Sequence, residues 1–144
     1  MKCLECGQNY RGAFTCPECG HMPEIVEVAH KAFDSFLCKS EKLRALVTGL
    51  MLFEIETRAF DEGGEGHIKC YPWVQLGFSE KDHEKLRKLK RIVETYNSFN
   101  KGPAWMIEKQ REEALCLVPK KKNLPAKVLQ ESAEEFGRFL YNVR

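Results

Sequence analysis

The sequence predicts a mainly α-helical protein in which a small cysteine-rich N-terminal module precedes a domain of roughly five helices. Four of the seven cysteines lie within the first 19 residues. From Pro23 onward, apolar residues recur at steps of three and four, which is the period of one face of an α-helix. The chain has 144 residues, 43% of them hydrophobic and 31% charged. That length and composition are typical of one ordinary globular domain and argue against a disordered chain.

The first 22 residues contain two Cys-x2-Cys pairs separated by nine residues. Two thiolates three positions apart can bind one metal ion if the backbone between them forms a tight turn. Gly7 and Gly20 follow the two pairs directly, where such a turn calls for a residue that tolerates positive φ. Four thiolates suit tetrahedral Zn²⁺ in a closed structural site that leaves no position for a water molecule. The predicted zinc ligands are Cys3, Cys6, Cys16 and Cys19.

This module resembles the zinc ribbon family, whose halves are rubredoxin-like knuckles of the form Cys-Pro-x-Cys-Gly. Residues 16–20, CPECG, match that form in full, and residues 3–7, CLECG, match it except that Leu4 replaces the proline. The resemblance implies β-hairpin knuckles around one structural zinc ion in residues 1–22, and it does not extend to residues 23–144. The short spacer favours zinc over the iron of rubredoxin. A redox-active Cys-x2-Cys is the alternative, but it needs only one pair on a βαβ unit, and no such unit is visible in the sequence.

Five helices are expected in the second domain, residues 23–144. Proline at the start of the first and last of them is favourable, because the first helical residue needs no amide proton. Ser40 is a candidate N-cap for the second helix, and Ser79 with Asp82 resembles a capping box for the third. The middle of the second helix is apolar nearly all round, which indicates a buried element, although a strand stays open there. The expected helices are residues 23–37, 40–58, 79–99, 103–117 and a last one from 125 past 140.

The segment between the second and third expected helices begins with a flexible acidic break, residues 61–66. Apolar side chains then alternate with polar ones in residues 67–78. This alternation could indicate a short strand, but Pro72 restricts such a strand to a sheet edge or an irregular loop. We expect an ordered crossover anchored by Trp73. A basic linker is expected at residues 119–123.

No catalytic motif for a phosphate loop, a serine nucleophile or a zinc protease is present in the sequence. Two Glu-x-x-His segments, Glu27–His30 and Glu80–His83, match one requirement of a rubrerythrin-like di-iron site, which also needs them to point inward. At about 100° per residue, both glutamates lie opposite the apolar stripes and are expected to face water. Cys38, Cys70 and Cys116 are expected to be buried as small hydrophobes. The sequence therefore predicts a protein that is not an enzyme, with a rubrerythrin-like redox protein as a remote alternative.

Charge is distributed unevenly along the chain, although 23 basic and 21 acidic side chains leave a net charge of only +2. Residues 61–80 carry a net charge of −3, and residues 81–111 carry nine basic and four acidic side chains. One interpretation is a solvated helix face whose lysine stems cover apolar surface. The other is a patch that contacts the phosphates of DNA or RNA. The candidate binding residues are Lys81, Lys85, Arg87, Lys88, Lys90, Arg91, Lys120, Lys121 and Lys122.

A second candidate contact set lies between the two knuckles of the N-terminal module, at the tip of the expected hairpin. There Tyr10, Arg11 and Phe14 place a basic side chain between two aromatic ones, a combination that suits either a protein or a nucleic acid. For Phe14 we expect instead that the ring packs the module against the helices.

The resemblance to zinc ribbons, which are frequent in transcription, replication and translation, implies a non-enzymatic regulatory or adaptor protein. It would act on nucleic-acid-handling machinery (transcription or replication) through nucleic acid, protein contacts or both. Fold alone does not determine function, so this expectation depends on the resemblance. The alternative is a pure protein–protein inhibitor or modulator of a host protein, such as a phage or bacterial factor. The strip of residues 81–91 discriminates between the two.

A cytoplasmic location is expected, with no membrane contact and no small-molecule substrate. The longest apolar stretch, Ala45–Phe53, has about half of the ~20 residues that a membrane-spanning helix requires. The N-terminal residues MKCLEC lack the apolar core of a secretory signal. In a reducing compartment, clustered cysteines bind metal more often than they form disulfides.

Overall fold

The structure of the protein, a computed structural model, describes residues 2–10, 15–36 and 40–143. These residues form four α-helices, two short 3-10 helices and four β-strands. In chain order the elements are α1 (Glu24–Asp34), η1 (Glu41–Leu43), α2 (Arg44–Leu52), β1 (Thr57–Asp61), β2 (Trp73–Ser79), α3 (His83–Phe99), β3 (Trp105–Lys109), η2 (Arg111–Glu113), β4 (Ala114–Pro119) and α4 (Ala126–Val143).

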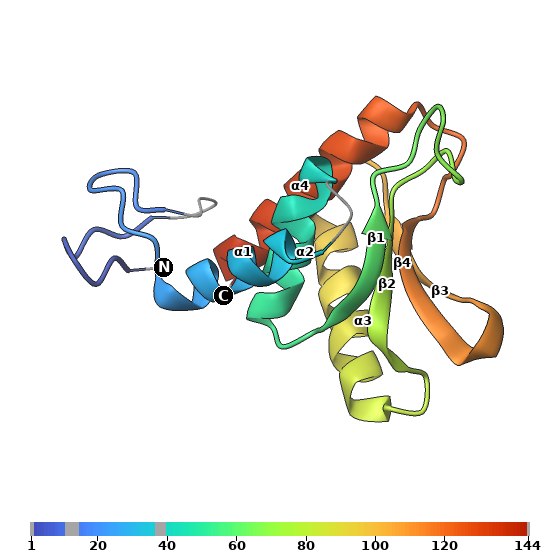
Figure 1. Cartoon of the computed structure of the whole chain (residues 1–144), viewed down its shortest axis with the longest axis horizontal. Coiled ribbons are helices and arrows are strands. Elements are labelled where there is room, and N and C mark those ends of the chain that lie inside the picture. The colour runs from blue at the N-terminus through green and yellow to red at the C-terminus, as the bar shows by residue number, and fades with distance from the viewer. Residues whose placement is uncertain (1, 11–14, 37–39, 144) are drawn as a thin grey trace.

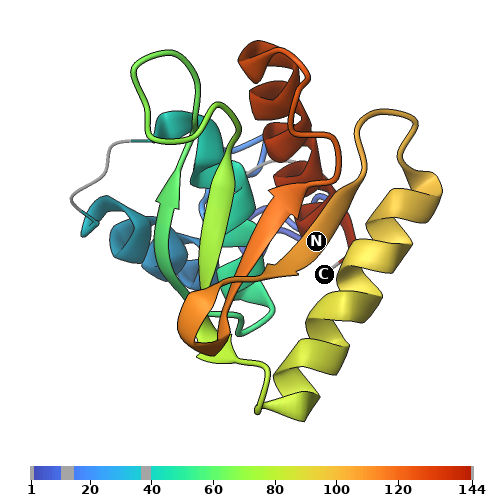
Figure 2. The ribbon, with the colours of Figure 1, turned by 90° about the vertical axis from the view of Figure 1, so that its right-hand side faces the viewer.

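The strands form a four-stranded antiparallel sheet in the order β1-β2-β4-β3. Because β2 and β3 are both antiparallel to β4, which lies between them, they run parallel to each other, and α3 connects them. All four helices lie on one side of the sheet (Figure 1). Figure 2 looks onto the other side, which no element of the described residues covers. We call this side the open face.

The main hydrophobic core lies between the sheet and the helices. Side chains of β2 and β4 alternate between this core and the open face, and Val74 is paired directly with Leu117 on the core side. Aromatic rings join the helices to this core, since Tyr96 of α3 stacks on Phe136 of α4 with centroids 4.2 Å apart. The largest fully buried side chains of the body include Trp105, Phe136, Leu46, Leu50, Ile55, Leu89, Leu117 and Leu140.

Helices α2 and α4 approach each other closely because glycines face the contact from both sides. A Cβ on Gly137 would lie 2.3 Å from the backbone carbonyl carbon of Ala45, and a Cβ on Gly49 would lie 3.0 Å from the Leu140 side chain. A side chain at position 137 would therefore collide with main-chain atoms of the neighbouring helix. The close approach is what places α2 in the centre of the helical layer.

The expected five-helix domain is wrong, because the body is a two-layer α/β structure. The error is largest in residues 103–117, the expected fourth helix, which form β3, η2 and most of β4. The ladder pairs Trp105 with Pro119 and Lys109 with Leu115. Residues 114–119, ALCLVP, are a short apolar run that ends in a β-branched residue and proline, a pattern that also fits a buried strand. Pairing with β2 and β3 makes this run a strand and not a helix.

The second expected helix is also too long. Helix α2 ends at Leu52, because Glu54 takes the left-handed conformation with φ 62° and the amide of Ile55 donates to the Leu50 carbonyl (3.1 Å). Residues 57–61 then form β1 instead of the last turn of a helix. The crossover expected in residues 67–78 becomes β2 from Trp73 onward. Pro72 precedes the strand and so costs no ladder hydrogen bond, which is why an interior strand is compatible with it.

The expected start of α3 is corrected, and the structure defines the buried face of α1. Helix α3 begins at His83, with Asp82 as the N-cap whose carboxylate accepts from the amide of Lys85 (3.2 Å). The buried stripe of α1 is centred on Val26 and Phe33, and Ile25 is 41% exposed. The division between residues 22 and 23 stays a prediction.

Candidate metal centre and charged surfaces

The N-terminal module consists of two turns of the same form. The amide of Gly7 donates to the carbonyl of Cys3 (2.9 Å), and the amide of Gly20 donates to the carbonyl of Cys16 (2.8 Å). In each turn the first cysteine also donates its amide to a carbonyl that follows the glycine (2.9 and 2.8 Å). Both glycines have φ 77°, a left-handed conformation that strains a residue with a side chain. The predicted role of these glycines is confirmed.

The two turns bring the four cysteines together. The sulfurs of Cys3 and Cys19 are 3.5 Å apart, as are those of Cys6 and Cys16. All four sulfurs lie within 4.8 Å of one another, and this is the one cluster in the described part of the chain with the geometry to bind a metal ion. Each close pair takes one cysteine from each turn, so a bound ion would tie the two turns together.

The four sulfurs fit a tetrahedral ion. With a metal–sulfur distance of about 2.3 Å, the edges of a tetrahedral thiolate shell are about 3.8 Å long. The observed spacing requires only small side-chain rotations to reach that shell. Cys3 and Cys16 are buried, and Cys6 and Cys19 are exposed, so the ion would lie near the surface of the module but have all four positions filled by sulfur.

Hydrogen bonds and the crowding of the sulfurs shift the pKa values of Cys3 and Cys6 in opposite directions. The amide of Cys6 donates to the sulfur of Cys3 and lowers the pKa of Cys3 to about 6. The amide of Gln8 lowers the pKa of Cys6, but desolvation and the neighbouring thiols Cys16, Cys3 and Cys19 outweigh it and raise that pKa to about 12. Amide donors therefore favour thiolates here, but four adjacent thiolates repel one another. A divalent cation removes that repulsion.

The candidate contact set between the knuckles is only partly described. Tyr10 is 6% exposed and packs with Cys3 and Cys16 inside the module, and desolvation raises the pKa of its phenol. Its ring therefore belongs to the small core of the module. Arg11 and Phe14 lie outside the described residues.

The basic strip lies on α3 and just before it. Lys81 pairs with Glu113 (3.3 Å), and the ammonium of Lys88 donates to the carbonyl of Phe53. The remaining four cations are exposed and form no ion pair or side-chain hydrogen bond with the part of the chain that the structure describes. These four are Lys85, Arg87, Lys90 and Arg91.

A groove of about 420 Å³ lies beside this strip. Phe53 from the end of α2 and Ile92 of α3 contribute its apolar part. Arg87 and Arg91, one helical turn apart, line it together with Lys88, and Glu84 is its one acidic residue. The groove combines positive charge with an apolar surface.

The second basic cluster lies elsewhere in the fold, after β4. Lys120 and Lys121 line a separate hollow of about 510 Å³ with Leu124 and Val128. Lys122 forms an ion pair with Glu108, which raises the pKa of Lys122, and lies over the ring of Tyr71 at 5.1 Å. The fold therefore gives this cluster and α3 separate hollows.

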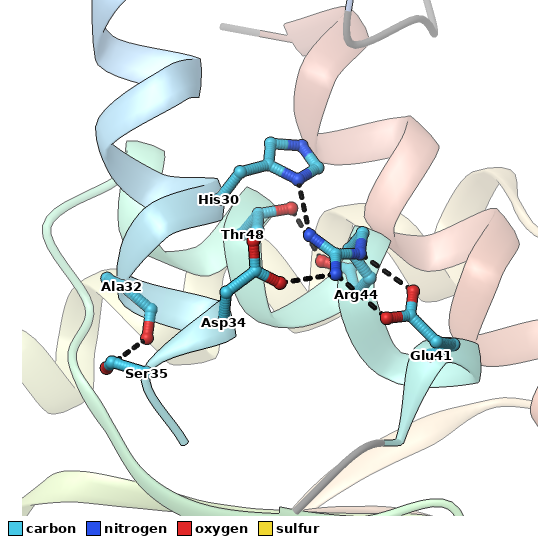
Figure 3. A network of polar contacts seen from close by, with 7 residues as sticks. All are labelled: His30, Ala32, Asp34, Ser35, Glu41, Arg44 and Thr48. Carbon is cyan, nitrogen blue, oxygen red and sulfur yellow. Dashed lines mark hydrogen bonds and ion pairs between the residues drawn. The ribbon is translucent and has the colours of Figure 1, made fainter. Parts of the chain in front are cut away.

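A polar network around Arg44, partly exposed to solvent, joins α1, η1 and α2 (Figure 3). The guanidinium of Arg44 donates to Glu41 twice (2.8 Å each), to Asp34 (2.5 Å) and to Nδ1 of His30 (2.9 Å). Because Arg44 can only donate, His30 accepts and is neutral. Desolvation and the charge of Arg44 lower the pKa of His30. The network ties three elements together, and we assign it a structural role.

The two Glu-x-x-His segments do not form a metal site. Glu27 pairs with Lys31 (3.4 Å) on the surface of α1, and Glu80 pairs with Lys109 (2.8 Å). Glu27 is exposed to solvent, as predicted, and Glu80 is partly exposed. His30 is the exception, because it is buried in the network around Arg44. Among the described residues, the cysteine cluster alone has metal-binding geometry.

The three other cysteines differ in their surroundings. Cys116 is 5% exposed in β4, which confirms the expected burial, and burial raises the pKa of its thiol. Cys70 is exposed, so the expectation was wrong for this residue. Its loop lies over the end of the sheet, where its thiol contacts the carbonyl of Lys122 (3.7 Å). Cys38 lies outside the described residues.

Comparisons with known protein families, curated proteins and solved structures found no match to this chain. In the described residues, no helix is both long and apolar enough to cross a membrane.

One surface was missed by the sequence analysis. A hollow of about 340 Å³ lies on the open face of the sheet, lined by Lys69, Trp73, Gln75, Gln110, Arg111, Ala114 and Cys116. Its lining residues come from two stretches of the chain, residues 69–75 and 110–116. The alternation in residues 67–78 was the one signal that could have located it, and Pro72 argued against taking it as an interior strand.

Proposed function

We propose that residues 1–22 form a zinc ribbon and that the protein is a non-enzymatic, cytoplasmic adaptor that binds nucleic acid through α3. It acts within nucleic-acid-handling machinery, in transcription or replication. The observation that carries the proposal is the group of four exposed cations on α3, at positions 85, 87, 90 and 91, which have no ion-pair partner among the described residues. A surface cation with no carboxylate partner is available to a phosphate at little cost.

Binding of this kind has a defined salt dependence. Each phosphate that a lysine or arginine neutralises releases a condensed counterion, so four contacts give a slope of log K against log salt of about −3.6 on duplex DNA. The contacts do not distinguish one base sequence from another, because no side chain of the strip is required to reach a base edge. We therefore expect α3 to contribute binding affinity and to position the protein on the nucleic acid.

The role of zinc in this proposal is structural. Cys3, Cys6, Cys16 and Cys19 would hold one ion, whose binding supplies the folding free energy of the module. A shell of four thiolates has no open position for a water or a substrate, so the ion takes part in no reaction. Purified protein is expected to be colourless with one zinc per chain. Iron colour would instead support a rubrerythrin-like redox protein.

Charge reversal on α3 tests the nucleic-acid proposal. The variant Arg87→Glu/Arg91→Glu is expected to weaken binding of random-sequence duplex DNA at least tenfold at low salt, and to reduce the salt slope by about two. The matched control is Lys42→Glu/Lys127→Glu, which makes the same change in net charge at exposed positions outside α3. Equal loss in both variants, or no loss in the first, would contradict the proposal.

The second candidate function is a protein–protein inhibitor, and the groove beside α3 favours it. Phe53 and Ile92 offer an apolar surface that a phosphate backbone does not need. Capture of partners from the native cell, with and without nuclease, separates the two functions. Partners that are lost on nuclease treatment support the nucleic-acid proposal. Partners that survive it, with no nucleic acid recovered and with binding lost in Ile92→Asp, support the inhibitor.

A further inference from the structure

The open face of the sheet carries polar, aromatic and cationic side chains where the helical side carries the core. Gln75 of β2 is paired directly with Cys116 of β4, and Cys116 is paired with Glu108 of β3. Directly opposed residues of neighbouring strands point to the same side of a sheet. Val74 and Leu117, one position along from Gln75 and Cys116, are fully buried on the helical side. The open face is therefore a surface in its own right.

The hollow on this face has a cation at each end. Lys69 lies in the loop before β2, and Arg111 lies in the turn before β4. Because β2 and β4 are antiparallel, the starts of these two strands lie at opposite ends of the sheet. Trp73, Gln75 and Ala114 line the hollow between the two cations. No acidic residue lines it.

Two aromatic rings lie close to Lys69 at its end of the hollow. The ammonium of Lys69 lies 5.6 Å from the ring centroid of Tyr71 and 5.9 Å from that of Trp73. The indole Nε1 of Trp73 is covered and has no hydrogen-bond partner among the described residues. Covering a hydrogen-bond donor without giving it a partner is unfavourable. The hydrogen bonding of this ring is therefore incomplete in the free chain.

The loop that carries Tyr71 is held in place by contacts to several elements. Gly63, with φ 72°, packs on the backbone of Tyr71 so closely that a Cβ would lie 2.3 Å from the Tyr71 carbonyl. The side-chain amide of Gln130 on α4 donates to the carbonyl of Gly63 (3.2 Å). Asp61 accepts from the amide of Gly63 (3.0 Å) and from Nδ1 of His67 (2.8 Å). The rings of Tyr71 and Trp73 are therefore carried by a well-supported loop and by strand β2.

Positive charge predominates around the hollow itself. Asp61 and Glu108 are already paired with His67 and Lys122, and Glu113 is paired with Lys81. Glu112 and Glu113 line the neighbouring hollow, together with Arg58. The cations Arg58, Lys69 and Arg111 make no ion pair with any described residue. An anionic ligand therefore meets available cations on this face and no free carboxylate inside the hollow.

We propose that the open face binds a single-stranded nucleic acid, with bases stacked on Trp73 and Tyr71 and phosphates contacted by Lys69 and Arg111. Aromatic side chains that accept unpaired bases, next to cations that follow the backbone, are what single-strand binding requires. A duplex is excluded from such contacts, because its bases are already stacked inside the helix. Gln75 stands between the two cations, where its amide can both donate to and accept from a base edge.

Lys69 must leave the rings when a base arrives, and the energies favour the exchange. A base stacked on an aromatic ring contributes more binding free energy than an exposed cation–π contact does. The flexible stem of Lys69 then allows its ammonium to move from the rings to a phosphate. The lysine thus gains one partner as it gives up another.

This inference goes beyond the proposed function, because it names a second surface and a class of ligand that α3 does not require. Helix α3 packs on the helical side of the sheet, so the two surfaces share no residue. The proposal for one surface can fail while the proposal for the other holds, and variants in each surface test the two proposals separately.

The test uses the intrinsic fluorescence of the full chain. Trp105 is fully buried and donates its Nε1 to Ser132 (2.9 Å), so the emission that responds to a ligand on the open face comes from Trp73. Titration with an oligothymidylate of about ten nucleotides, within the site size of known single-strand binders, is expected to quench this emission. A duplex of equal length is expected to quench at least tenfold more weakly, and polyglutamate not at all.

Variants assign the contacts. In Trp73→Leu, the affinity for a dye-labelled oligothymidylate is expected to fall about tenfold or more, with the salt slope unchanged. In Lys69→Gln and Arg111→Gln the slope is expected to fall by about 0.7 each, the value for one phosphate contact on a single strand. The control is Phe99→Leu, an aromatic residue that is 75% exposed at the end of α3, and it is expected to bind as the wild type does.

Several results would overturn the inference. They are unchanged Trp73 emission at saturating oligonucleotide, equal quenching by duplex or by polyglutamate, and unchanged affinity in all three open-face variants. Lys69→Gln and Arg111→Gln change exposed or loop side chains, so they keep the test valid if Trp73→Leu folds poorly. The α3 variant Arg87→Glu/Arg91→Glu is expected to keep the quenching of Trp73. Loss of quenching in that variant alone would place the single strand on α3 and reject the open face.

Discussion

The N-terminal module and the α/β body differ in how much they bury. Among its described residues, the module buries three hydrophobic side chains, Cys3, Tyr10 and Cys16, in a cluster of its own. The body buries a continuous core that joins both layers, with side chains such as Trp105 and Phe136 fully inaccessible. The figures agree with this difference, since the module extends from the start of α1, away from the sheet (Figure 1). Because its own core is so small, we expect the module to depend on a bound metal ion, whereas packing holds the body together.

The largest expected effect follows from removing one thiol of the module. Cys16→Ser takes one of four ligands from the proposed zinc site, where zinc binding would be worth about 10 kcal/mol or more in folding free energy. We expect loss of the bound zinc and disorder of residues 2–22, with the unfolding midpoint of the body little changed. Metal analysis measures the zinc content of the module. Thermal unfolding followed by Trp105 emission measures the stability of the body. Cys70→Ser, which removes an exposed thiol outside the cluster, is the matched control and is expected to keep the zinc.

The second effect is the converse, a change that damages the body and spares the metal site. A methyl group on Gly137 would collide with the backbone of Ala45, so Gly137→Ala forces α2 and α4 apart. We expect the free energy of unfolding to fall by about 3 kcal/mol, in the upper part of the range for overpacking, with zinc content unchanged. Denaturant unfolding measures this fall in the free energy of unfolding. Gly102→Ala meets only the side chain of Asn100, at 3.3 Å, and is expected to be nearly neutral. A similar loss in both variants would show that the helix contact is not the cause.

The smallest effect concerns pH. Desolvation and the charge of Arg44 lower the pKa of His30 in the folded protein, against the raising influence of Asp34 and Glu41. The unfolded chain therefore binds a proton more readily than the folded one. Stability from this group is complete above the usual histidine pKa of about 6.5 and is lost as the pH falls from there through the folded pKa.

The measurement compares the unfolding free energy of the body at about pH 7.5 and about pH 5.5, on either side of the usual histidine pKa. Wild type is expected to lose more stability on acidification than His30→Gln, because both proteins share the carboxylates but only wild type carries this histidine. His83→Gln, at an exposed position at the start of α3, is expected to behave as wild type. An equal loss in wild type and His30→Gln would show that His30 contributes nothing.

The metal-binding geometry was predictable because its causes are local. Each knuckle is made by five consecutive residues, and its glycine needs positive φ whatever the rest of the chain does. The body was only partly predictable. Helices α1, α3 and α4 were found because their apolar stripes repeat within one segment. Strand β3, most of β4 and the first two residues of β1 were instead assigned to helices. A short apolar run such as ALCLVP is compatible with either structure.

The sequence by itself determined the four-cysteine cluster, the glycines of its two turns and the basic character of α3. All of these depend on residues close together in the chain. The tertiary structure alone decided that residues 105–109 and 114–119 pair as strands, that Trp73 and Arg111 line one hollow, and that Gly137 meets Ala45. The physical reason is that a strand has no internal hydrogen bonds: its partner, and hence which side of it faces outward, is chosen by segments tens of residues away.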